Sequence, residues 1–124
     1  MTQTRDADPG IPFPRAMFDR IPTRHGKALD GLRLAGGLAR DILLKAAALV
    51  EPGITTGEID RFVASELKAA GATSAFLNYQ VGNKRFPGHI CIGLNEVVVH
   101  GIGGDHKIRA GDIVKIDVGL KKDG

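Results

Sequence analysis

Apolar residues in the first half of the chain recur at the spacing of helices. Over residues 27–50 they fall every three or four positions, which is one face of an amphipathic α-helix. The members of this face are Leu32, Ala35, Leu38, Ile42, Ala46 and Leu49. A second helix is predicted after Thr55, because Thr55 and Glu58 have the spacing of a capping box. Its apolar face would be Ile59, Phe62, Val63, Leu67 and Ala70, and Gly71 would end it in a left-handed conformation.

After Gly71 the pattern becomes one of short segments, several with the two-residue period of strands. Residues 75–79 are apolar, residues 81–87 read as a loop, and residues 89–94 alternate as a strand does. We predict a second short strand over residues 97–100, a flexible corner at residues 101–104, and a last strand over residues 113–120. In that last strand Val114, Ile116, Val118 and Leu120 share one face, and Lys115 and Asp117 the other. The expected class is α/β (α+β), with two helices followed by antiparallel strands.

The start of the chain differs in composition from the rest. Residues 1–24 carry four of the six prolines and few regularly spaced apolar residues. A segment with little apolar area to bury does not recover the entropy lost on ordering. We therefore predict an N-terminal extension over residues 1–24 and a folded part over residues 25–124, which at 124 residues in all is one domain.

Charge and cysteine content restrict the partners. The net charge is +3, but the basic residues are scattered rather than clustered, so DNA is not an expected partner. A single cysteine, Cys91, cannot form an internal disulfide, which favours a reducing compartment and a cytoplasmic location. The sequence has no apolar run of the roughly 20 residues that a membrane span needs, so no membrane association is expected.

Four side chains are candidates for chemistry. Asp117 lies in a strand otherwise made for burial, where a carboxylate needs a partner such as Lys115 or a backbone amide, or else a metal ion. His100, at the end of a predicted strand, suits a catalytic group or a surface histidine. His89 and Cys91 are two residues apart and would share a strand face as half of a zinc site, but no other pair completes such a site, and Cys91 better suits a core or a small pocket.

Two motifs bring in a family. The segment Phe86–Ile102 resembles the signature of type I methionine aminopeptidases, in which a histidine follows an Asn-Glu-Val-Val strand. The segment Ala110–Gly119 resembles the next motif of that family, and Leu34–Gly36 and Glu51–Asp60 are similar to its first two helices. The resemblance covers about residues 29–124.

The resemblance implies the N-terminal half of a pita-bread fold, whose complete form holds two divalent metal ions (Co, Mn, Fe or Zn) and hydrolyses a peptide bond. It implies that Asp117 is a metal ligand and that His100 hydrogen-bonds the substrate. Tyr79, Phe86 and Cys91 would line the pocket for the first side chain of the substrate. That substrate would be the N-terminal methionine of nascent polypeptides, with the ribosome as a further partner.

The chain departs from the family in two places. Residues 81–85 read as a short insertion, and the further aspartate, histidine and glutamate ligands of the family would all follow Gly124. We therefore expect a fragment that is inactive by itself, because one carboxylate does not hold two ions. The alternatives are a non-catalytic half-fold that acts as a binding or interaction module, and a relative with another substrate, such as a proline-specific peptidase.

Overall fold

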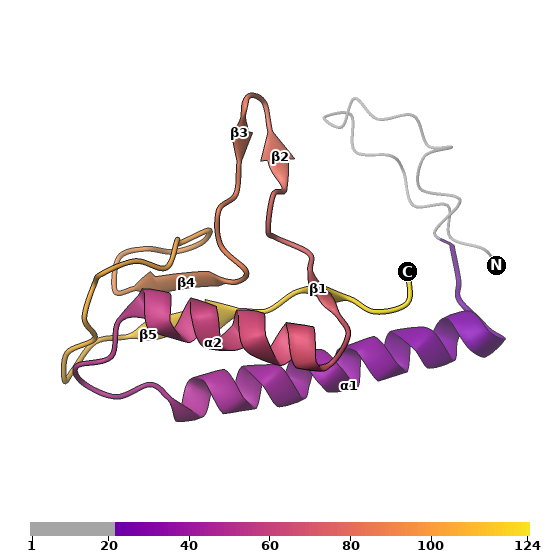
Figure 1. Ribbon diagram of the computed structural model, residues 1–124, viewed down its shortest axis with the longest axis horizontal. Helices are drawn as coiled ribbons and strands as arrows, with labels where there is room; N and C mark the ends of the chain where they lie inside the picture. The colour runs from indigo at the N-terminus through magenta and orange to yellow at the C-terminus, as the bar shows by residue number, and fades with distance from the viewer. Residues whose placement is uncertain (1–21) are drawn as a thin grey trace, which may run out of the picture.

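The computed structural model describes residues 22–124 of the protein (Figure 1). The N-terminal extension predicted over residues 1–24 lies, up to residue 21, outside the described residues.

Two helices come first, as the sequence predicts. Helix α1 spans Gly26–Ala48 and helix α2 spans Thr56–Ala69. The capping box is confirmed, because the Glu58 amide donates to Thr55 Oγ1 at 3.1 Å and the Thr55 amide donates to Glu58 Oε2 at 2.7 Å. Gly71 follows α2 with φ +61°, the left-handed conformation expected of a glycine that ends a helix.

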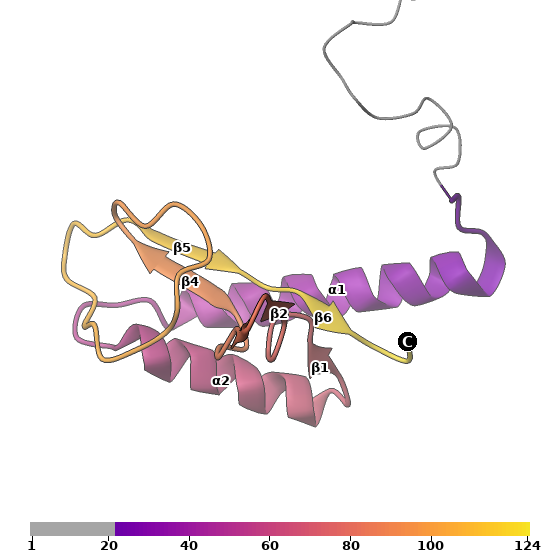
Figure 2. The same ribbon diagram turned by 90° about the horizontal axis from the view of Figure 1, so that it is seen from above.

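Short strands make up the rest of the fold. They are β1 (Thr73–Ser74), β2 (Gln80–Val81), β3 (Lys84–Arg85), β4 (Cys91–Leu94), β5 (Val114–Asp117) and β6 (Leu120–Lys121). They form three antiparallel pairs, β1 with β6, β2 with β3 and β4 with β5. The prediction of two helices followed by antiparallel strands is confirmed, and Figure 2 shows β4 on the α2 side of the molecule and β5 on the α1 side.

Three predictions about strands were wrong in part. Residues 97–100 form no strand. The free edge of β4 offers the Ile92 amide, and this amide donates to the carbonyl of Gly101 at 2.9 Å in place of residues 97–100. Residues 81–87, predicted as a loop, include three of the four strand residues of the β2–β3 hairpin and the turn between them. The strand predicted over residues 113–120 is two strands, since Gly119 accepts a hydrogen bond from Ala75 at 2.9 Å and the chain then pairs with β1.

The core lies between the two helices and the β4–β5 pair. Buried apolar residues come from every layer: Ile42, Ala46, Ile59, Val63, Leu67, Ala72, Ile90, Ile92 and Ile108. Val114, Ile116, Val118 and Leu120 all pack against this core, so the predicted apolar face is confirmed across both strands. The first half of α1 extends past the sheet (Figure 2) and leaves Leu32 57% and Leu34 59% exposed.

The hydropathy of the helices differs from that of membrane spans. Within residues 22–124, neither α1 nor α2 combines the length and the apolar character that crossing a bilayer requires.

Candidate functional site

The β4–β5 pair brings two of the predicted site residues face to face. In this antiparallel register Cys91 stands directly opposite Asp117. Cys91 is 8% exposed, whereas Asp117 at the end of β5 is exposed, so the expectation of a buried carboxylate was wrong. Lys115 is not its partner, because the Lys115 ammonium donates to the backbone carbonyl of Asn95. Among residues 22–124 the Asp117 carboxylate has no hydrogen-bond or ion-pair partner.

A hollow of about 230 Å³ opens beside this pair, and we call it the Asp117 pocket. Its floor is formed by the two strands and its rim by the segment that follows β4. The lining residues are Cys91, Gly93, Val97, Val98, Val99, His100, Gly101, Lys115, Ile116 and Asp117. Of the five site residues that the family resemblance implies, three border this pocket, namely Cys91, His100 and Asp117.

His100 reaches this pocket from an irregular segment rather than from a strand end. Its φ is +55°, a left-handed conformation that is uncommon outside glycine, although histidine, asparagine and aspartate adopt it more often than other residues. Such a conformation persists where the surrounding structure imposes it, and it is concentrated at functional sites. The imidazole is exposed at the rim, where it is accessible to a ligand in the pocket.

The Cys91 thiol is a neutral part of the wall. Burial, and secondarily the negative charge of Asp117, raise the pKa of Cys91 above its ordinary value. The thiol is therefore protonated at neutral pH and presents a small, weakly polar surface to the pocket, in place of a thiolate nucleophile.

Tyr79 and Phe86 lie elsewhere, at the base of the β2–β3 hairpin. The Phe86 amide donates to the Tyr79 carbonyl at 2.9 Å, and the Phe86 ring meets the Phe76 ring edge-on with centroids 6.5 Å apart. Tyr79 is 64% exposed. Neither residue borders the Asp117 pocket in this structure.

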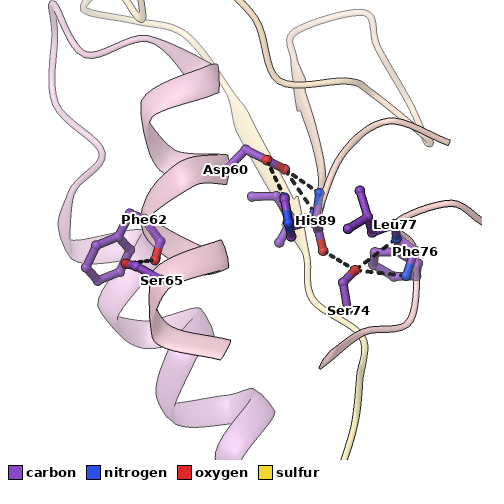
Figure 3. A network of polar contacts seen from close by, with 8 residues as sticks. Asp60, Phe62, Ser65, Ser74, Phe76, Leu77 and His89 are labelled. Carbon is purple, nitrogen blue, oxygen red and sulfur yellow. Dashed lines mark hydrogen bonds and ion pairs between the residues drawn. The ribbon is translucent and has the colours of Figure 1, made fainter. Parts of the chain in front are cut away.

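The zinc hypothesis for His89 and Cys91 is not supported by their surroundings. His89 precedes β4, and its Nδ1 lies 3.1 Å from Asp60 Oδ2 on α2 (Figure 3). Asp60 Oδ1 also accepts the amides of His89 at 2.7 Å and Ile90 at 3.0 Å. No three His, Cys, Asp or Glu side chains gather into a potential metal site within the described part of the chain. Asp60 is therefore an anchor for the start of β4.

Two features of this region escaped the sequence interpretation. Lys115 borders the Asp117 pocket, and the shared strand face of Lys115 and Asp117 was the signal that could have placed it there. Asp60 gave no such signal, because its partners His89 and Ile90 are 29 and 30 residues away in sequence. A larger hollow of about 680 Å³ is lined mainly by the connection between β4 and β5, and none of the predicted site residues borders it.

The Asp117 carboxylate is the kind of donor that hard and borderline divalent cations prefer, and it is neither buried nor neutralised by a neighbour. Its chemistry therefore suits a metal ligand. A site for two ions needs several such donors, and residues 22–124 gather no group of three. Residues 22–124 therefore supply only part of a site of that kind.

Comparison with known proteins gives consistent matches. Residues 30–124 match the model of Metallopeptidase family M24. A mitochondrial methionine aminopeptidase 1D of Dictyostelium discoideum is 42% identical over 86% of this chain and 25% of its own length. A methionine aminopeptidase of Haemophilus influenzae is 44% identical over 84% of this chain and 38% of its own length.

The fold of a solved relative agrees as well. The crystal structure of methionine aminopeptidase from Rickettsia prowazekii superposes with a TM-score of 0.77 at 36% sequence identity, over 84% of this chain and 40% of that protein. The chain thus spans between a quarter and two fifths of the length of these relatives. Within that span the arrangement is the partial α+β domain expected of a pita-bread fold.

Proposed function

The chain belongs to metallopeptidase family M24, and on that premise we propose that it forms part of a methionine aminopeptidase. The activity would be removal of the N-terminal methionine from nascent polypeptides by metal-dependent hydrolysis. The names of the relatives support this substrate. The single observation that carries the proposal is the Asp117 pocket, which has a carboxylate, an imidazole and a thiol around one hollow.

In this proposal Asp117 supplies one carboxylate ligand to a pair of divalent ions, which are Co, Mn, Fe or Zn. When bound, such ions lower the pKa of a water molecule and stabilise negative charge on the peptide oxygen. The exposed carboxylate at the end of β5 keeps its charge available for a cation, since no cationic side chain in residues 22–124 pairs with it. The remaining ligands would belong to polypeptide outside residues 22–124, which agrees with the greater length of the relatives.

The other two pocket residues have different roles. His100 would donate an imidazole N–H to the substrate near the scissile bond, where charge develops during the reaction. Cys91, protonated and largely buried, would contact the methionine side chain, since a thiol surface suits an unbranched thioether. Tyr79 and Phe86 remain candidates for the same contact on the strength of the resemblance alone, because they do not border the pocket.

The cysteine content of the chain bears on its cellular compartment. A chain with one cysteine, and with that thiol largely buried, favours a reducing compartment, and we propose the cytoplasm. Nascent polypeptides emerge from the ribosome, so docking there would place the enzyme beside its substrate.

The test begins with the native gene product. Its coding region is sequenced past the codon for Gly124, its intact mass is measured, and its release of methionine from a Met-Ala-Ser peptide is followed with added Mn²⁺, Co²⁺, Fe²⁺ or Zn²⁺. We expect metal-dependent release that is lost in Asp117→Asn and retained in Asp105→Asn, which removes the same charge from an exposed position away from the pocket. Native protein that releases no methionine with any of the four ions would refute the proposed activity.

The exposed apolar residues of α1 favour a second candidate, an interaction module. Leu32 and Leu34 are each more than half exposed on a helix that extends past the sheet. Because they are two residues apart on the helix, they lie on different sides of it, and each would be a separate contact with other polypeptide. A native product without hydrolytic activity, together with a stable complex that Leu32→Ser and Leu34→Ser disrupt, would favour this candidate over the enzyme.

A further inference from the structure

We propose that Asn95 and Asp112 are positioning residues, which together hold the segment 96–100, and with it His100, against Asp117. We call the pair the Asn95–Asp112 latch. This inference rests on the proposed function, because it assigns to the latch a role in the same reaction.

The latch closes the long connection between β4 and β5 at its base. Asn95 Nδ2 donates to Asp112 Oδ1 at 3.0 Å, and the Ile113 amide donates to Asn95 Oδ1 at 3.0 Å. The second carboxylate oxygen of Asp112 accepts the Arg109 amide at 2.8 Å. The Asn95 side chain thus joins the residue after β4 to the residues before β5.

The backbone of Asn95 is fixed as firmly as its side chain. Its amide donates to the Ile113 carbonyl at 2.9 Å, and its carbonyl accepts the ammonium of Lys115. Its φ is +51°, a left-handed turn that asparagine tolerates better than most residues. This turn determines the direction in which the chain leaves β4.

A second anchor holds the far end of the segment. The Gly101 carbonyl accepts the Ile92 amide at 2.9 Å, and a Cβ atom on Gly101 would collide with the Ile92 carbonyl oxygen. Between the two anchors, residues 96–100 make one hydrogen bond in the described part of the chain, from the Val97 amide to the Leu94 carbonyl at 3.0 Å.

Packing contributes at one residue only, since every residue from 96 to 100 is exposed and Val97 alone lies close over the strand, above Gly93. The place of the His100 imidazole at the rim of the Asp117 pocket therefore follows from its two end points. Gly101 is a steric anchor to the strand beneath, whereas the Asn95–Asp112 latch depends on a pair of complementary polar side chains. That complementarity can be broken and restored by exchange.

The exchange provides the experiment. Asn95→Asp places two carboxylates face to face. Asp112→Asn leaves either the side-chain amide of Asn95 or the backbone amide of Arg109 without its acceptor. The double variant N95D/D112N restores every hydrogen bond and reverses only the one between the two side chains, because the side-chain amide introduced at position 112 donates to the carboxylate introduced at position 95. The oxygen atoms at positions 112 and 95 still accept from the Arg109 and Ile113 amides. Asn83→Asp, at the exposed turn between β2 and β3, is the matched control for the added charge.

We expect each single variant to lower kcat for methionine release about 10- to 100-fold with KM changed less than twofold, as displacement of a substrate-contacting group does. The kcat of the double variant should return to within about threefold of the wild-type value, and the kcat of N83D should equal the wild-type value. In a His100→Ala background, N95D should produce no further loss of kcat, because the latch acts through His100. A purely structural role would instead give an additive loss.

Failure of this inference is separable from failure of the proposed function. If wild type releases methionine but N95D keeps full kcat, or lowers it equally in the His100→Ala background, the latch assignment is overturned and the enzyme stands. If wild type is inactive, the backbone amide chemical shifts of residues 97–101 test whether the latch holds the segment. They should move in N95D and return in the double variant, and unchanged shifts would overturn the latch. Should N95D not fold, D112N and the double variant carry the same comparison.

Discussion

Two neighbouring stretches of similar apolar residues have opposite environments. Ile90 and Ile92, at and within β4, are 0% and 2% exposed, whereas Val98 and Val99 in the segment after β4 are 77% and 67% exposed. The first stretch is fixed by packing against the helices, and the second by polar and steric contacts at its two ends. A rigid strand next to an exposed segment held at its ends is an arrangement suited to a binding site.

Truncating one apolar residue in each stretch tests the difference between them most directly. Ile90→Ala should lower the free energy of unfolding by about 2 to 5 kcal/mol, because it leaves a cavity among fully buried neighbours. Val98→Ala should change it by less than about 0.5 kcal/mol. Urea unfolding of both variants measures the difference, and equal losses would show that the exposed segment is packed after all.

The next effect concerns catalysis. His100→Ala should lower kcat for methionine release by about 10²- to 10³-fold, the usual cost of removing one donor to a developing charge. Metal content should stay at the wild-type level, because His100 contacts the substrate in our proposal and is not a ligand. Elemental analysis of the purified variant checks this, and a parallel loss of metal would move His100 into the metal shell.

A methyl group at the steric anchor should have a smaller effect. Gly101→Ala should cost about 1 to 3 kcal/mol in unfolding free energy, since the added Cβ meets the backbone of Ile92. Gly104→Ala is the matched control, because a Cβ there has nothing within 4 Å. If both variants lose the same stability, the anchor assigned to Gly101 is wrong.

The smallest effect is a pH dependence. Hydrogen bonds from the Asn95 side chain, and then from the Arg109 amide, hold the pKa of Asp112 below its ordinary value of 3.8. A lowered folded-state pKa gives stability that is present above the ordinary value and is lost as the pH falls through the folded-state pKa. Wild type should therefore lose more stability than D112N as the pH is lowered from about 5 to below 3. Parallel unfolding curves for the two proteins would contradict this contribution.

Local signals predicted the helical half of the fold. The capping box at Thr55 and Glu58, the terminating Gly71 and the apolar face of α2 are read within a few residues of one another. The alternation from Val114 to Leu120 identified the face that meets the core for the same reason. These features depend on near neighbours, so the sequence alone contains them. The face predicted for α1 was wrong at Leu32, which is 57% exposed because the first half of α1 extends past the sheet.

Long-range pairing decided what the sequence did not show. Three consecutive valines favour a strand, but Gly101 takes the Ile92 amide and leaves residues 97–100 without a partner. The β2–β3 hairpin lacks an apolar alternation, although Gly82-Asn83 is a two-residue turn that could have revealed it. For the site, the resemblance named His100, Cys91 and Asp117 and the structure brings them to one pocket, whereas Asn95 and Asp112 are joined across 17 residues.

The central claim is that Asp117 is a metal ligand of a family M24 peptidase. Its most direct test is the metal content of the native gene product, measured by elemental mass spectrometry after loading with Mn²⁺ and removal of free ion, in wild type, Asp117→Asn and the control Asp105→Asn. The account predicts a clear loss of bound metal in Asp117→Asn alone, because an amide lacks the charge that holds the cation. Wild-type metal content in Asp117→Asn would contradict it.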